Sequence, residues 1–209
     1  AADQTGIAIR QARLYQKAAA TSMREALVNK LSVAIRASLS LASVLNTATR
    51  ELGQTLSASR VEVRLSDAAG DQSFARGEYT AAGCESVSDF DADYDELLRG
   101  HFLESLTPLV IGDTQQYMEG PPEFTNCIRL RAARTGVRSQ IDYPLTVNGE
   151  FRGAISIHQT ESIRRWTEDE VLLVESVAAQ LATGIAQAEL FEMVARAKKE
   201  WESTFDAMS

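Results

Sequence analysis

The stretch that decides the fold runs over residues 137–160 and reads VRSQIDYPLTVNGEFRGAISIHQT. Apolar residues alternate with other residues in its first half, where one side carries Ile141, Tyr143, Leu145 and Val147. Alternation with a period of two is typical of a half-buried strand. Asn148-Gly149 favours the positive φ angles of a two-residue turn, so the stretch predicts an antiparallel β-hairpin.

Further strand and helix signals surround this hairpin. Val61, Val63 and Leu65 alternate with charged residues and predict another strand. We expect a turn, a hairpin partner, a helix, a short apolar strand and a short helix, in that order, at residues 67–70, 72–80, 92–105, 108–111 and 127–134.

The last helix has the clearest start signal. Thr167 and Glu170 form a capping box, in which each residue satisfies a backbone N–H of the other. Apolar residues then recur at helical spacing at Val171, Val174, Ala178, Leu181, Ile185 and Ala188. The pattern continues towards Trp201 without a stop signal. A helix that outruns its own domain usually packs on a partner or continues into another module.

The first helical region covers residues 7–56 and contains no proline. Ser38 and Ser40 predict a break there, with a hydroxyl capping the second helix. The sequence IRQARLY at residues 9–15 matches IAQAELF at residues 185–191. The first helix therefore has the sequence character of the final helix of a preceding, similar domain.

Composition excludes several classes of protein. The 209 residues are 44% hydrophobic and 24% charged, which is typical of a soluble globular protein. A net charge of -8 disfavours nucleic-acid binding, and we expect no apolar run of the roughly 18–20 residues that membrane insertion requires. Cys84 and Cys127 form neither a disulfide framework nor a zinc motif. A reducing, cytoplasmic location is the expectation.

Motifs of common enzymes are absent from the sequence. It contains no nucleophile elbow, P-loop, H-E-x-x-H or dinucleotide-binding fingerprint, and its only histidines are His101 and His158. We therefore expect no catalytic residues, no metal site and no enzymatic activity.

In their order along the chain and in their residues, four segments resemble the GAF family. They are SLASVLNTATRELGQTLSASRVEVRL, PLVIGD, the hairpin described above, and RRWTEDEVLLVESVAAQLATGIAQAELF. The resemblance implies an α+β fold (an α/β sandwich) with an antiparallel sheet of about six strands. It also implies long N- and C-terminal helices on one face and a ligand pocket on the other.

The resemblance further implies a place in a tandem bacterial sensor. Residues 1–37 are expected to end a preceding domain, residues 38–192 to form the GAF domain, and residues 193–209 to lead into a following one. We read the chain as a piece of a larger signal-transduction protein, similar to a histidine kinase of a two-component system. The implied partners are a second copy, contacted through the terminal helices, adjacent sensor or output domains, and a small-molecule ligand.

Among GAF domains, the sequence most resembles those of phytochromes and cyanobacteriochromes. Those domains carry a bilin-attaching cysteine about ten residues before the hairpin, as Cys127 stands before Val137, although Ile128 replaces the usual following histidine. The resemblance gives as candidate cofactor-binding residues Cys127, His158, Asp113, Arg138, Tyr143 and Ser156. The cofactor is left unknown, with bilin as a candidate. The main interpretation is a sensory relay, and the alternative is a photosensor or redox sensor that uses Cys127.

Each candidate also has a structural interpretation. Cys127 could be a buried apolar residue, His158 a hydrogen-bonded core residue, and Asp113 the start of an Asx turn. Asp142 suggests an ion pair with Arg138 across the sheet. A basic cluster formed by Arg129, Arg131, Arg134 and Arg138 could clamp a carboxylate or phosphate or simply be solvated.

Overall fold

The structure, a computed structural model, describes residues 2–38, 40–66, 73–86 and 92–207. The turn predicted at residues 67–70 lies outside these ranges. The elements in chain order are α1 (Ala2–Ala37), α2 (Leu41–Leu56), β1 (Arg60–Ser66), β2 (Ser73–Thr80), α3 (Ala92–Ser105), β3 (Leu109–Ile111), α4 (Pro122–Thr135), β4 (Ser139–Val147), β5 (Glu150–Gln159) and α5 (Glu168–Ala207).

The described strands form one antiparallel sheet in the order β2-β1-β5-β4-β3. It has five strands in the described residues, where we expected about six. The predicted hairpin is confirmed as β4 and β5, and both turn residues have positive φ angles, 54° at Asn148 and 85° at Gly149. The α+β class is likewise confirmed.

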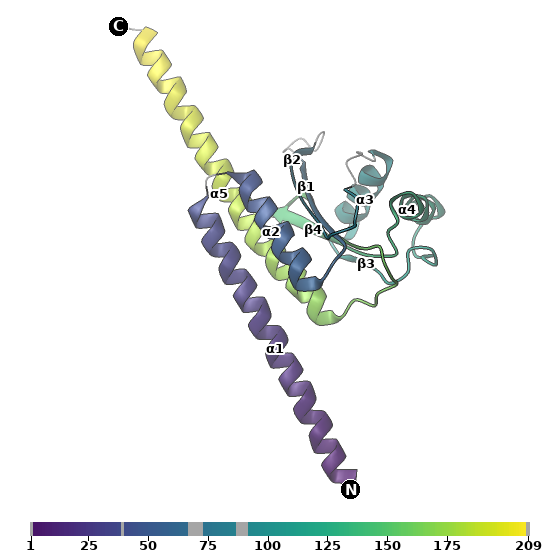
Figure 1. The fold of residues 1–209 in the computed structure, drawn as a ribbon. Coiled ribbons are helices and arrows are strands. Elements are labelled where there is room, and N and C mark those ends of the chain that lie inside the picture. Colours follow the sequence, from purple (N-terminus) through teal and green to yellow (C-terminus); the bar gives the residue numbers. More distant parts are fainter. Residues whose placement is uncertain (1, 39, 67–72, 87–91, 208–209) are drawn as a thin grey trace.

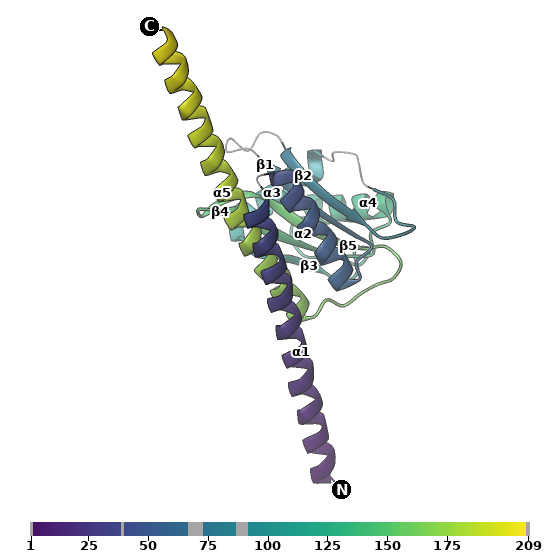
Figure 2. The same cartoon turned by 60° about the vertical axis from the view of Figure 1, so that its left-hand side comes forward.

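The helices lie in layers on both faces of this sheet (Figure 1). On one face α2 and α5 pack against the strands, and α1 lies outside them, as a second view confirms (Figure 2). On the other face lie α3 and α4. The main core fills the space under α2 and α5, and its buried strand residues are Val61, Val63, Leu65, Ile141, Leu145, Val147, Ile155 and Ile157. The predicted placement of the long terminal helices on one face is confirmed.

Local signals explain where the helices begin and end. The Ser43 backbone N–H donates to Ser40 Oγ, so Ser40 caps α2 as predicted. The capping box of α5 is confirmed, with Thr167 N donating to Glu170 Oε2 (2.8 Å) and Glu170 N donating to Thr167 Oγ1 (3.3 Å). Helix α4 begins at Pro122, well before residue 127, because a proline is accommodated in the first helical turn.

The two terminal helices extend past the sheet in opposite directions (Figure 1). In the described part of the chain, the segment Glu168–Trp201 is long and apolar enough to cross a membrane when judged by length and composition alone. We expected no such segment from the sequence, and this expectation was wrong on that criterion. The first turns of α5 belong to the core, where Leu173, Val174 and Val177 are buried.

Gly153 permits a close approach between the central strand β5 and β1. Its φ angle is +146°, which side-chain-bearing residues rarely adopt. A Cβ atom there would lie 2.0 Å from the carbonyl oxygen of Arg64, which is backbone and cannot rotate away. Gly100, in α3, has no atom within 4 Å of the equivalent position.

We predict opposite effects for alanine at these two glycines. Gly153→Ala should lower the free energy of unfolding by at least about 2 kcal/mol, because it adds both a clash and backbone strain. Gly100→Ala should raise it by up to about 1 kcal/mol, because alanine favours the helix. Urea denaturation of both variants measures this, and equal stabilities would contradict the fold around β5.

Candidate functional site

One face of the sheet is polar although it is buried. Strand pairing places Arg60 opposite His158, and His158 opposite Gln140. Side chains at alternate positions share this face, which α3 and α4 cover. We call these side chains the polar layer: Arg60, Glu62, Arg64, Gln140, Asp142, Ser156 and His158. Most of them are buried, and buried polar groups are costly unless they are hydrogen-bonded.

Asp142 is the centre of one half of the polar layer. It is fully buried and accepts hydrogen bonds from Ser156 Oγ (2.5 Å), Gln140 Nε2 (2.6 Å) and the Tyr94 hydroxyl (3.0 Å). Burial raises the pKa of Asp142, although these hydrogen bonds and the charge of Arg131 act in the opposite direction. Burial and Asp142 together raise the pKa of Tyr94 well above 10.0, so its hydroxyl stays protonated and ties α3 to the sheet.

Glu62 is the centre of the other half. Arg64 donates to Glu62 Oε2 through Nη2 at 2.7 Å and Nε at 3.0 Å, and also binds Asp95 of α3 at 2.8 Å. Arg60 Nε lies 3.4 Å from Glu62 Oε1. The charges of this half are therefore paired with one another, as buried charges must be.

His158 lies between the two halves and is fully buried. Its Nδ1 accepts a hydrogen bond from Arg60 Nε at 3.1 Å. Because a guanidinium only donates, the proton of the neutral ring is on Nε2. Burial lowers the pKa of His158 well below 6.5, and the positive charges of Arg131, Arg60 and Arg64 lower it further. His158 is therefore a neutral hydrogen-bond donor at pH 7.

Arg131 of α4 covers the polar layer from the helix side. It is 3% exposed, and its guanidinium carbon lies 4.1 Å from the centre of the Tyr94 ring, a cation–π geometry. The predicted basic cluster is therefore split. Arg134 and Arg138 are exposed, and Arg129 binds Asn126 Oδ1 on its own helix.

Comparison with known proteins identifies the family of this chain. The model of the GAF domain family matches residues 40–185. The chain belongs to the GAF family. It is 24% identical over 189 residues to the circadian input-output histidine kinase CikA of Thermosynechococcus vestitus, a match that covers 86% of this chain. The chain spans 25% of the length of that curated relative.

Solved GAF domains share the fold. The phycocyanobilin-bound GAF domain of a cyanobacterial phytochrome has a TM-score of 0.67 at 23% identity, covering 80% of this chain and 96% of that one. A methyl-accepting chemotaxis protein has a TM-score of 0.60 at 21% identity, covering 77% of this chain and 98% of that one. At these identities the likeness shows the fold, and the residues of this GAF domain must be considered on their own.

The six candidate residues are dispersed. Ser156 and His158 belong to the polar layer. Cys127 is half-buried and packs on the second core cluster under α3 and α4, one helical turn before Arg131. Asp113 Oδ1 accepts from Gln115 N at 3.0 Å, so the alternative interpretation as an Asx turn is confirmed.

Arg138 and Tyr143 lie apart from the polar layer. The exposed Arg138 precedes β4, and its backbone N–H binds the carbonyl of Gln159. Tyr143 packs on the main core, on the opposite face from Asp142, because neighbouring strand residues alternate. Grouping Tyr143 with His158 and Ser156 was therefore wrong.

The structure adds Arg60, Tyr94 and Gln140, which we had not selected, and retains Arg131 from the predicted basic cluster. All four contact the polar layer or belong to it. The predicted Asp142–Arg138 ion pair was wrong, because the side-chain partners of Asp142 in the described residues are the neutral donors given above. The useful signal was RVEVR at residues 60–64, whose charged positions share one face.

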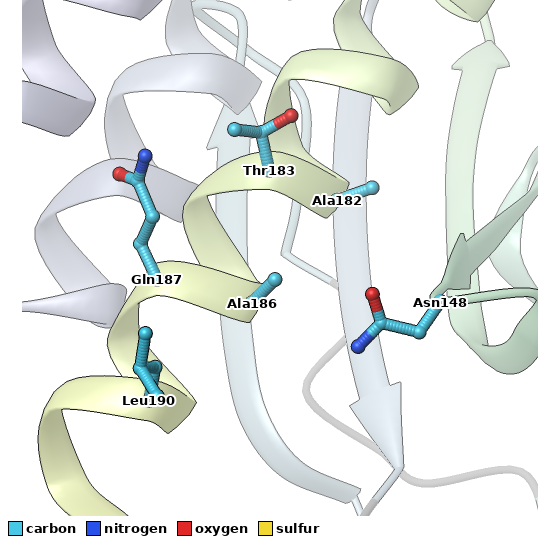
Figure 3. Close-up of a pocket in the computed structure, with 6 residues that line it drawn as sticks. All are labelled: Asn148, Ala182, Thr183, Ala186, Gln187 and Leu190. Atoms are coloured by element: carbon cyan, nitrogen blue, oxygen red, sulfur yellow. The ribbon is translucent and has the colours of Figure 1, made fainter. Parts of the chain in front are cut away.

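A second feature lies on the opposite side of the domain. A groove of about 400 Å³ separates the hairpin tip at Asn148 from α5 (Figure 3). Its helical wall consists of Ala182, Thr183, Ala186, Gln187 and Leu190. Three of the wall residues, Ala182, Thr183 and Ala186, have small side chains.

We predict that His158 makes the stability of this GAF domain depend on pH. A histidine whose pKa is lowered on folding stabilises the native state above its unfolded pKa, and this contribution is lost as the pH falls. Relative to His158→Gln, the wild type should lose stability below pH 6.5 with a slope approaching about 1.4 kcal/mol per pH unit.

Urea denaturation of both proteins between pH 7.5 and pH 5.0 measures the effect. The difference between the two proteins at each pH cancels the contributions of other groups. Parallel stability curves would contradict a neutral, desolvated His158.

Proposed function

We propose that the chain is a regulatory sensory GAF module of a signal-transduction protein. It relays a ligand or pocket state through dimeric helices to a downstream output domain. The observation that best supports this is the position of β5. Ser156 and His158 of this strand lie in the polar layer, while Arg152 of the same strand binds Glu189 of α5 at 2.5 Å.

The Arg152–Glu189 pair gives the relay a physical route. Arg152 is largely buried and Glu189 is partly buried, so the pair is protected from much of the screening that weakens surface pairs. Leu190 and Phe191, which follow at once, are exposed. A shift of β5 on ligand binding is therefore passed to α5 at the point where the helix leaves the domain.

The terminal helices support a two-fold dimer. Helices α1 and α5 run in the same direction side by side (Figures 1 and 2). Their projecting parts expose large apolar side chains: Ile7, Ile9, Leu14, Tyr15, Leu190, Phe191, Met193, Val194 and Trp201. In a parallel pair of chains each patch meets its own copy, as an isologous interface requires. The groove on α5 continues this surface towards the hairpin (Figure 3).

The same proposal extends to the neighbouring domains and the cellular setting of the module. Residues 1–37 end a preceding domain, residues 38–192 are the GAF module, and residues 193–209 enter a following domain. The histidine-kinase relative supports a two-component system. The module acts in the cytoplasm, without membrane insertion and without catalytic turnover of its own.

We predict that Phe191→Glu weakens a dimer of the full 209-residue chain. A buried charge at the seam should raise the dissociation constant at least tenfold, which corresponds to about 1.4 kcal/mol. Leu130→Glu is the matched control, because Leu130 is exposed on α4, away from the terminal helices. Native mass spectrometry over a concentration series measures both, and a wild type that is monomeric throughout would contradict the relay.

A bilin photosensor or redox sensor that uses Cys127 is the second candidate function. Cys127 and Arg131 are four residues apart on α4, so their side chains share a helix face. Cys127 packs against the second core cluster, which also contains Tyr94, the partner of Asp142. The titles of similar solved structures name bound phycocyanobilin and phycoerythrobilin in cyanobacterial phytochromes.

The bilin alternative makes a separate prediction. Co-expression with enzymes of bilin synthesis should give a protein with visible absorbance that survives denaturation, because the thioether is covalent. Cys127→Ala should abolish the covalent colour and Cys84→Ala should retain it. A colourless wild-type protein would exclude this alternative and leave the relay standing.

A further inference from the structure

Three buried nitrogen atoms around the polar layer have no hydrogen-bond partner among the described residues. They are Arg60 Nη2, Arg131 Nε and His158 Nε2. All three are donors, since arginine stays protonated and the His158 proton is on Nε2. A buried donor without an acceptor costs about 1–3 kcal/mol. In the described residues the polar layer sets these three unpartnered donors against one unpartnered buried acceptor, Glu62 Oε1.

These donors belong to one region of the site. Arg60 Nε contacts His158 Nδ1 at 3.1 Å, which joins β1 to β5. Arg131 reaches the same region from α4, because its guanidinium carbon lies 4.1 Å from the centre of the Tyr94 ring. The Tyr94 hydroxyl accepts a hydrogen bond at 2.9 Å from Gln140 Nε2, and Gln140 is the strand neighbour of His158. Arg60 thus contacts the neutral imidazole from β1 while Arg131 approaches the same polar layer from α4, and their positive charges repel one another.

Neighbouring carboxylates do not meet this demand. Asp142 already accepts from three neutral donors. Glu62 Oε2 accepts from Arg64, and Glu62 Oε1, which has no hydrogen bond, lies 3.4 Å from Arg60 Nε as an ion-pair contact. Because Glu62 is already shared by two arginines of β1, Arg131 Nε and His158 Nε2 still have no acceptor among the described residues.

We propose that the polar layer binds a small molecule through an oxyanion, a carboxylate or a phosphate, held by Arg60, Arg131 and His158. This inference rests on the proposed sensory function and names the class of its ligand. An oxyanion brings several acceptor lone pairs to the donors, and arginine holds such groups in a bidentate manner. Its negative charge also relieves the repulsion between Arg60 and Arg131. A cation would be repelled by Arg60 and Arg131 and would offer no acceptor to the three donors.

Nitrogen NMR of the histidines tests the proposal on the intact 209-residue chain. The chain has two histidines, so a ¹⁵N-histidine spectrum is simple, and His101→Gln assigns it. The probes are inorganic phosphate and succinate, added separately, with sodium chloride at matched ionic strength. We expect one of the two to shift the His158 Nε2 resonance in a saturable manner, which also tells phosphate from carboxylate.

Two arginine variants distinguish the site from general charge. Arg131→Met should raise the dissociation constant of the bound probe at least tenfold. Arg138→Met, from the same basic stretch of sequence but exposed, should leave it unchanged. Absence of a saturable shift with both probes in the wild type would overturn the proposal, as would equal losses in the two variants.

Failure of this inference is distinguishable from failure of the sensory relay. A wild type that forms the helix dimer but binds neither probe would contradict the oxyanion ligand and leave the relay supported. A wild type that binds a probe at His158 but stays monomeric would support the ligand class and contradict the dimeric relay.

Discussion

The fold depends on one constraint, which is that charged side chains of a central sheet lie on a buried face. Period-two alternation places Arg60, Glu62 and Arg64 on the same side of β1, while Val61 and Val63 point to the main core. The apolar face holds α2 and α5 mainly by hydrophobic burial, to which the Arg152–Glu189 pair adds a polar contact with α5. The polar face requires partners of opposite character, and α3 supplies them through Tyr94 and Asp95.

This division gives the two faces different mechanical properties. Packed apolar surfaces resist change because any displacement opens voids. A polar layer with unpartnered buried donors gains free energy when a ligand supplies acceptors, so a ligand can favour the arrangement that it satisfies. Strand β5 takes part in both, since Ile155 and Ile157 are in the core while Ser156 and His158 are in the polar layer. It is the element through which one face can act on the other.

Sequence predicted those parts of the fold whose signals are local. The Asn148-Gly149 turn and the Thr167 capping box depend on residues next to one another, and both are confirmed. The polar layer depends on residues from β1, β4, β5 and two helices, and no local pattern distinguishes it from a solvated strand face. Arg131 and Arg134 are alike in sequence, but Arg131 is buried over the Tyr94 ring whereas Arg134 is exposed.

The energies involved are sufficient for the proposed relay. Moving a two-state equilibrium from 1:99 to 99:1 needs a difference in ligand affinity of about 5.5 kcal/mol between the states. Each buried donor left without an acceptor costs about 1–3 kcal/mol, so satisfying three of them in one state makes a difference of that order available. A ligand held by Arg60, Arg131 and His158 therefore has a physical reason to prefer one arrangement of β5 over another. The Arg152–Glu189 pair then connects that preference to the helix that leaves the domain.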